Sequence, residues 1–202
     1  MKKVIFTVLC MAVALILCVS FSSTATALAA NNVNYSPEDN VIETPLPGKV
    51  TVKNLPSKNL PSVSPNSLLY SYSIRNISKQ IFNLFYPLTN YATGYCNLTY
   101  SRSVAFTVDA NISTSVGVSA DIVQASIGSN VGVSNTVTAS ESVSYEIPSG
   151  YKGRIVIRYS QNYYTFTCVK RNRVTGSETT GPGSATTGAY DPYYARQLIA
   201  IS

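Results

Sequence analysis

The feature that most constrains this chain is a long stretch in which apolar and polar residues alternate. Nine of the ten even-numbered positions from Val104 to Ile122 are apolar, whereas the odd positions between them are mostly Ser, Thr, Asp, Asn and Gly. Strict period-two alternation predicts β-strand with one apolar and one polar face. The pattern lasts for about twenty residues, well beyond the roughly 5–6 residues of an ordinary strand.

The phase of this alternation changes after Ile122, and the apolar residues then fall on odd positions as far as Ile147. Facing residues of an antiparallel pair share one face and have numbers with a constant sum. An even apolar strand therefore pairs with an odd apolar strand only if that sum is odd. A hairpin over 103–147 satisfies this rule if Ile122 faces Val131 and Phe106 faces Ile147.

Such a hairpin suits either a β-sandwich or a membrane barrel. One hairpin cannot span a bilayer, because its edges leave backbone groups unpaired in lipid, but several copies that close a ring can. In a ring, the side chains that face lipid would be Val104, Phe106, Val108, Ile112, Val116, Val118, Ile122, Ile127, Val131, Val133, Val137 and Val143. The side chains that face the water-filled lumen would be Thr107, Ser113, Ser115, Ser119, Ser134, Thr136, Thr138 and Ser142.

The N-terminal residues predict export. Lys2 and Lys3 precede an apolar run, and small residues follow as far as Ala29, which is typical of a secretory signal peptide over 1–29. An uncleaved membrane anchor is the alternative. Cleavage leaves 13 Lys and Arg against 9 Asp and Glu, a net charge of +4 that does not indicate a nucleic-acid partner. We expect a secreted, extracellular protein, either released or held at the cell wall.

Two further segments complete the predicted organisation. Residues 30–66 carry six prolines among many Asn, Ser and Lys, which predicts a flexible leader or linker. Residues 67–202 are expected to form a single β domain that contains the hairpin. Apolar residues at helical spacing predict a short amphipathic helix near 74–86, with a strand as the alternative for its first part. The expected fold is all-β, mainly antiparallel, with long twisted strands in an elongated sandwich.

The sequence pattern of the C-terminal third predicts further strands, which carry most of the basic residues. A turn at Gln161-Asn162 is expected to separate two of these strands, and 176–188 is a loop by composition. The basic side chains predicted to form a surface beyond the hairpin are Lys152, Arg154, Arg158, Lys170, Arg171 and Arg173.

Two cysteines, Cys96 and Cys168, remain after signal cleavage. In an oxidising exterior such a pair usually forms a disulfide. Here the bond would raise the free energy of unfolding by roughly 4 kcal/mol, because it closes a long loop in the unfolded chain. Two free buried thiols are the alternative.

The composition argues against an enzyme. The chain has no histidine, which removes Ser-His and Cys-His nucleophile activation and the commonest metal ligand. The spacing of Asp and Glu residues in the sequence does not by itself exclude a glycosidase that uses two carboxylates. We expect no catalytic residues, no metal and no cofactor.

The stretch "SVAFTVDANISTSVGVSADIVQASIGSNVGVSNTVTASESVSYEIPSGYKGRIVI" resembles the pore-forming region of aerolysin-like toxins, including the epsilon-toxin and mosquitocidal-toxin branch. Those proteins carry a Ser/Thr-rich amphipathic hairpin, and a turn like Ile147-Pro148-Ser149-Gly150 leads into the next strand. The resemblance covers about 103–170. It implies a soluble secreted monomer that forms a homo-oligomer on a target-cell membrane, through anionic lipid or a surface receptor, and converts the hairpin into a β-barrel.

A non-lytic reading competes with this one. Val/Ile and Ser/Thr also alternate in secreted β-sandwiches, where the polar face meets water and the apolar face meets the other sheet. On that reading the chain is a surface, adhesion or carbohydrate-binding module.

Overall fold

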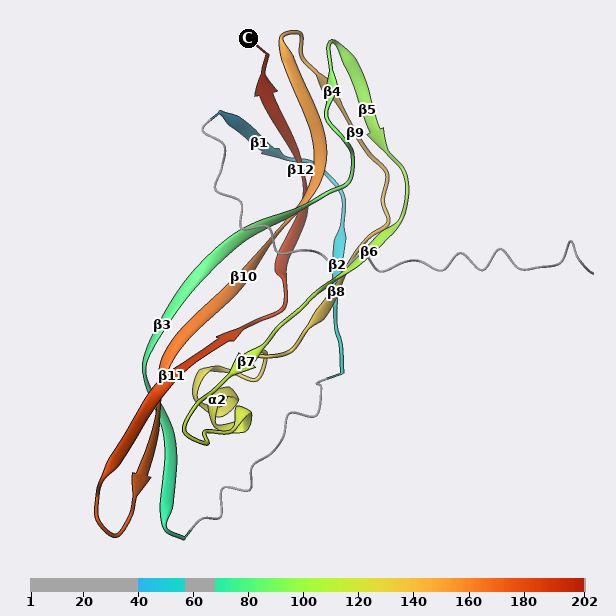
Figure 1. The fold of residues 1–202 in the computed structure, drawn as a ribbon. Coiled ribbons are helices and arrows are strands. Elements are labelled where there is room, and N and C mark those ends of the chain that lie inside the picture. The colour runs from blue at the N-terminus through green and yellow to red at the C-terminus, as the bar shows by residue number, and fades with distance from the viewer. Residues whose placement is uncertain (1–39, 57–67, 202) are drawn as a thin grey trace, which may run out of the picture.

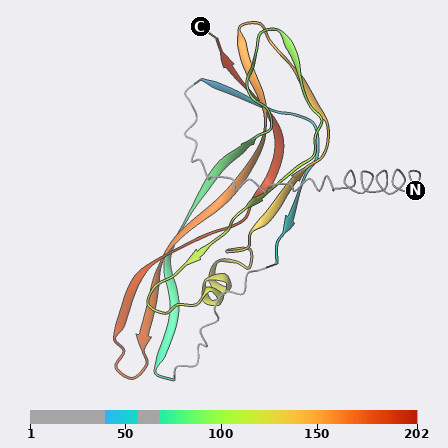
Figure 2. The ribbon, with the colours of Figure 1, turned by 45° about the vertical axis from the view of Figure 1, so that its right-hand side comes forward.

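Strand β10, Tyr151–Asn172, runs along most of the molecule and organises the rest of the fold (Figure 1). The computed structural model describes residues 40–56 and 68–201. The predicted signal peptide and much of the predicted leader lie outside the described residues. The described chain is elongated and built mostly of antiparallel strands, which confirms the expected fold class (Figure 2).

The main sheet forms on both edges of β10. One edge pairs with β3, Tyr70–Pro87, and at its start with β4, Ala92–Thr93. The other edge pairs first with β12, Tyr190–Ala200, and then with β11, Glu178–Thr186. Two outer strands complete this sheet: β1, Val41–Pro45, pairs with β12, and β7, Ile112–Ser113, pairs with β11.

A second layer contains the arms of a long hairpin. Its strands are β5, Cys96–Tyr100; β6, Val104–Val108; β8, Asn135–Ala139; and β9, Val143–Ile147, and the outer strand β2, Val50–Asn54, pairs with β8. The β5–β9 and β6–β8 ladders share one register, because Cys96 with Ile147 and Val104 with Ala139 both add to 243. The two ladders are therefore consecutive parts of one ribbon.

Two β-bulges interrupt the pairing of β10 without interrupting β10 itself. The register shifts show that extra residues lie in β3 opposite Phe166 and in β12 opposite Tyr159. Asn76 and Asp191 adopt positive φ values of 55° and 48° at these two places. Asn and Asp tolerate this conformation better than other non-glycine residues, which explains their position in the bulges.

The apolar residues form two clusters on opposite faces of the main sheet. The first cluster, which we call the upper core, contains Ile155, Ile157 and Tyr159 of β10. The second cluster, the lower core, contains Phe166 and Cys168 of β10. Successive side chains of a strand point to opposite faces, so the change from odd to even positions places the two cores on opposite faces.

The predicted helix near 74–86 is wrong, because these residues belong to β3. The bulge at Asn76 shifts the strand phase and produces an apparent helical spacing from residues on different faces. Ile77 and Ile81 illustrate this, since they are 44% and 56% exposed whereas Leu84 is buried in the upper core.

Three other local predictions are also wrong. Within the predicted leader, 41–54 contains β1 and β2, both at sheet edges, where proline is tolerated because no inner ladder bond is lost. No turn occurs at Gln161-Asn162, since β10 continues through both residues. Most of the predicted loop 176–188 is β11.

The predicted hairpin register is wrong by ten positions, although its odd parity is right. Phe106 faces Val137 in place of Ile147. Ile147 faces Cys96, so β5, which lies outside the predicted hairpin, forms the outer part of that arm. The turn is correspondingly larger, and it contains the only helix among the described residues.

Candidate functional site

The connection between β6 and β8, residues 109–134, lies against the lower part of the main sheet (Figure 1). We call it the tucked segment. It contains β7, which pairs with β11, and the helix α2, Ala120–Ile127, which packs near β3. The hairpin arms thus continue into a segment that lies on another sheet.

The phase change of the sequence pattern falls within the helix. Ile122 and Val123 are adjacent apolar residues, which an alternating strand cannot place on one face but a helix can. Val116 and Gly117 have positive φ values of 49° and 82°, which ends the extended chain before the helix. The helix therefore replaces the strand continuation that the alternation predicted.

Apolar contacts hold the tucked segment in the lower core. Val118, Val123 and Val131 are at most 3% exposed, and they pack with Phe166 of β10 and Ala185 of β11. Full burial of a valine contributes roughly 1.5–3 kcal/mol. Ile112, Val116, Ile122 and Ile127 of the segment are partly buried against the same cluster and add to this attachment.

Polar contacts close the neck of the tucked segment, where its two ends leave the hairpin. The side-chain amide nitrogen of Gln161 donates to the carbonyl oxygens of Asp109 at 2.9 Å and Thr187 at 2.7 Å. The Ala110 N–H donates to the Ser134 hydroxyl at 2.9 Å, which joins the two ends directly. Gln161 is only 5% exposed, so these bonds lie in a dry environment where an unpaired amide would be costly.

The link between β11 and β12 supplies the other half of this clamp. The Asn135 side chain donates to the Ala189 carbonyl at 2.7 Å and accepts from the Ala189 N–H at 2.9 Å. The Gly188 N–H donates to the Val133 carbonyl at 3.1 Å, and the Gly132 N–H donates to the Thr186 carbonyl at 2.8 Å. We call the neck contacts of Asn135, Gln161 and residues 186–189 the clamp.

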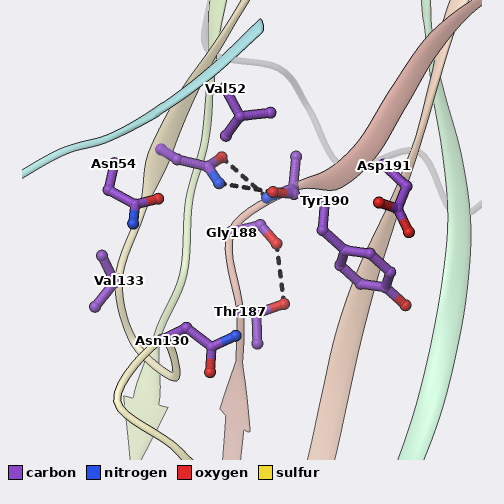
Figure 3. Close-up of a pocket in the computed structure, with 10 residues that line it drawn as sticks. Val52, Asn54, Asn130, Val133, Thr187, Gly188, Tyr190 and Asp191 are labelled. Carbon is purple, nitrogen blue, oxygen red and sulfur yellow. Dashed lines mark hydrogen bonds between the residues drawn. The ribbon is translucent and has the colours of Figure 1, made fainter.

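A cavity of 380 Å³ lies beside the clamp (Figure 3). Its lining includes Asn54 at the end of β2, Asn130 and Val133 of the tucked segment, and Tyr190 and Asp191 of β12. The cavity thus lies where the tucked segment, the second layer and the main sheet meet.

Glycines allow the close approach of the tucked segment and the clamp. A Cβ atom at Gly181 would lie 2.4 Å from the Ser115 hydroxyl, and that hydroxyl donates to the Pro182 carbonyl at 2.6 Å. A Cβ atom at Gly188 would lie 2.5 Å from the Asn135 amide. Both distances are too short for a side chain, so these contacts require glycine.

None of the predicted lipid-facing residues is fully exposed in this structure. Phe106, Val108, Val118, Val131, Val137 and Val143 are buried, and Val104, Ile112, Val116, Ile122, Ile127 and Val133 are half-buried. Those in the arms contribute to the upper core and those in the tucked segment to the lower core, except Val133, which lines the cavity. Ser113 and Ser142 of the predicted lumen set are exposed, Ser119 is buried, and Thr107, Ser115, Ser134, Thr136 and Thr138 are half-buried.

The six predicted basic residues do not form one surface. Lys152, Arg154 and Arg158 lie at the upper end of β10, about 40 Å from the group formed by Lys170, Arg171 and Arg173 at ~3.3 Å per residue. The upper group already has partners. The Arg158 guanidinium is 2.5 Å from the Glu43 carboxylate, and that of Arg154 lies 4.4 Å from the centre of the Tyr91 ring.

The predicted disulfide is wrong, because Cys96 and Cys168 are both free. Gly153 pairs with Ala92, which places Cys96 near the upper end of β10. Cys168 lies about fifteen residues farther along the same strand, or ~50 Å away. Each thiol packs against a different core, Cys96 against the upper core and Cys168 within the lower one.

The sequence pattern indicates part of the clamp. Asn135 interrupts the apolar odd positions between Val133 and Val137, and Gln161 continues the odd positions after Ile157 and Tyr159. A polar residue on an apolar face is buried and must have partners. Thr187 carries no comparable signal, because it lies in a polar stretch.

The described residues contain no group of three His, Cys, Asp or Glu side chains that could hold a metal ion. In the same part of the chain, no helix has the length and apolar character that a membrane-crossing helix needs. Comparison with protein-family models, curated proteins and solved structures finds no match for this chain.

Proposed function

We propose that this protein is exported, forms an oligomer on a target membrane, and inserts residues 109–134 as the end of an amphipathic β-hairpin. The proposal agrees with the resemblance to aerolysin-like toxins. The observation that carries it is the register of the hairpin arms, together with what happens when that register is continued.

Continuing the register through the tucked segment places apolar residues opposite apolar residues. Pairs that add to 243 bring Ile112 opposite Val131 and Val116 opposite Ile127. The remaining pairs on that face are Ala110 with Val133, Val118 with Ala125, Ala120 with Val123, and the single polar pair Thr114 with Ser129. The other face is made of Asp109 and of Asn, Ser, Gly and Gln residues, and the turn falls at Asp121-Ile122. Without any change of register, the segment can therefore become two strands with one apolar face.

The length of the extended segment also suits a bilayer. Its two halves, 109–120 and 123–134, have about 12 residues each, and a tilted barrel strand needs ~9–11. Neither half contains Lys or Arg. The two carboxylates, Asp109 and Asp121, would lie at opposite ends of the hairpin, outside the hydrocarbon.

The edges of the main sheet provide a way to form the oligomer. Among the described residues, β3 pairs only with β10, so its other edge is open along the strand. The opposite edge at the lower end is β11, which is covered by β7 and by Ser115. Release of the tucked segment uncovers β11, which can then pair with β3 of a second copy and continue the sheet.

A non-lytic binding module is the competing function. It predicts that the tucked segment keeps its contacts with β11 at all times, and that target binding leaves membranes intact.

The experiment separates these two functions. Exported protein is added to dye-loaded liposomes and to target cells, and leakage is measured together with detergent-resistant oligomers. A polarity-sensitive probe is placed singly at Ile112, Ser113, Thr114, Ser115 and Val116, with Asn97 in the β5 arm as a control. We expect leakage and a lipid environment at Ile112 and Val116 but an aqueous one at Ser113 and Ser115. Leakage-free binding with unchanged probe signals would leave only the binding module.

A further inference from the structure

The lower end of the molecule combines exposed apolar side chains with a local excess of positive charge. It consists of the start of β3 and the turn between β10 and β11, residues 68–70 and 170–176 (Figure 1). We call it the basal tip. It is separate from the tucked segment, which packs higher on the same sheet.

Three large apolar side chains project from the basal tip. Leu68 is 91% exposed, Val174 is 78% exposed and Leu69 is 55% exposed. The Arg173 N–H donates to the Leu69 carbonyl at 2.9 Å, which holds the two parts of the tip together. Exposed apolar side chains that are grouped at one end of a protein indicate an interaction surface.

The turn that carries Val174 is ordered by hydrogen bonds. The Asn172 side-chain oxygen accepts from the Val174 and Thr175 N–H groups at 2.9 and 3.1 Å. The Asn172 N–H donates to the Ser177 carbonyl at 2.8 Å, and Gly176 has the positive φ of 73° that closes the turn. Val174 is therefore presented in a fixed position, which lowers the entropy cost of binding.

The charges around these apolar residues are mainly positive. Lys170 lies 4.1 Å from the centre of the Tyr70 ring, and Arg171 and Arg173 are exposed. Glu178 is the carboxylate near them in the part of the chain that the structure describes, and Arg75 binds it at 3.2 Å. Three cations beside exposed Leu and Val side chains match a surface with anionic head groups above hydrocarbon.

The opposite end of the molecule also has exposed apolar side chains, Ile42, Tyr95 and Ile201, but its basic residues are half-buried and have partners. Tyr95 is 76% exposed there, but its hydroxyl interacts with the Glu146 carboxylate, which raises the pKa of Tyr95. A carboxylate at that position would repel anionic head groups. The charge pattern therefore distinguishes the two ends.

We infer that the basal tip docks on an anionic lipid bilayer, with Leu68, Leu69 and Val174 in the interface and Lys170, Arg171 and Arg173 on the head groups. Asn172 at the tip is four residues beyond Cys168 of the lower core, or ~13 Å. Docking would thus bring the tucked segment close to the bilayer. The inference rests on the proposed function for its purpose, but binding can be measured without leakage.

The test is flotation of exported protein with vesicles of phosphatidylcholine alone or with phosphatidylserine added, at low and high salt. We expect binding only to vesicles that contain phosphatidylserine, weakened by salt. The variant K170Q/R171Q/R173Q should bind ~100-fold more weakly, at roughly fivefold per cation. The variant L68S/V174S should bind at least tenfold more weakly, while the matched variant Y95S at the other end should bind like the original chain.

A second readout covers variants that fold poorly. In a chain with Cys96 and Cys168 replaced by alanine, a polarity-sensitive probe at Val174→Cys should enter an apolar environment on vesicles, and one at Tyr95→Cys should not. Equal binding of all variants, a shift at Tyr95 alone, or no binding to anionic vesicles would overturn the inference. Binding without leakage would support the basal tip and contradict the proposed pore, and leakage with intact binding of the tip variants would do the reverse.

Discussion

Asn135 and Ala189 exchange two hydrogen bonds, one from the Asn135 side chain to the Ala189 carbonyl at 2.7 Å and one from the Ala189 N–H to the Asn135 side-chain oxygen at 2.9 Å. The amide side chain thereby satisfies both backbone groups of Ala189, as a neighbouring strand would. Asn135 is the first residue of β8, where the tucked segment ends, so this exchange joins the end of that segment to the main sheet.

Asn135→Leu should destabilise the protein, because it leaves both backbone groups of Ala189 buried without partners. Each unsatisfied group costs about 1–3 kcal/mol, so we expect a loss of about 3 kcal/mol in the free energy of unfolding. Urea unfolding measures this loss, and Asn97→Leu on the exposed face of β5 is the control. Equal stability of the two variants would contradict the role of the clamp.

Val123→Ala should loosen the tucked segment specifically. The side chain is fully buried in the lower core, and its truncation should cost about 2 kcal/mol through lost burial and the resulting cavity. Val174→Ala, at a position 78% exposed, should change stability by less than about 0.5 kcal/mol. Amide hydrogen exchange should increase in 109–134 for Val123→Ala and remain unchanged in β3 and β10. Faster exchange throughout the chain would mean that the segment does not open separately.

Alkaline pH should destabilise the upper core. Burial raises the pKa of Tyr145 to about 12, and burial also raises the pKa values of Tyr159 and Tyr194. A phenol whose pKa is higher in the folded than in the unfolded state stabilises the fold below about pH 10, and this contribution is lost as the pH rises to about 12. Urea midpoints should therefore be constant to about pH 9 and then fall, and Tyr145→Phe should fall less steeply. A midpoint that rises above pH 10 would contradict the burial of these phenols.

Reducing agent should leave the stability of the protein unchanged, because Cys96 and Cys168 are free and lie in different cores. Urea midpoints with and without dithiothreitol test this directly. Mass spectrometry of the alkylated, unfolded chain should show both thiols labelled without prior reduction. A loss of several kcal/mol in the free energy of unfolding on reduction would show instead that Cys96 and Cys168 form a disulfide.

Sequence patterns predicted those features that depend on local alternation. The odd parity of the hairpin followed from the even and odd apolar sets, and the register in the structure agrees with it. The register itself depends on how many residues leave the ribbon at its end, and the alternation in 109–122 also fits a strand. Contacts with residues that are distant in sequence, such as Phe166 and Ala185, favour the helix and the tucked arrangement.

The longest strands were also the hardest to predict, because their irregularities resemble other structures. The bulge at Asn76 gives β3 an apparent helical spacing. Gln161 and Asn162 resemble a turn, but both are buried by contacts with the clamp and with Tyr190. The sequence indicates only part of the clamp, through Asn135 and Gln161, which are polar residues at positions of an apolar strand face.

A disulfide that locks the tucked segment to the main sheet tests whether this segment must leave the sheet before membranes leak. Ser113 and Ser184 face each other in the β7–β11 pair, whereas the extended register would move Ser113 opposite Asn130. Both serines are replaced by cysteine in a chain with Cys96 and Cys168 changed to alanine. The control places the cysteine pair at Asn97 and Glu146, which face each other in the arms and would remain paired in both states.

The measurement is dye release from liposomes before and after reduction. We expect oxidised S113C/S184C protein to bind membranes without leakage, reduction to restore leakage, and the control pair to leak in both conditions. Full leakage from the oxidised, locked protein would show that residues 109–134 need not leave the main sheet.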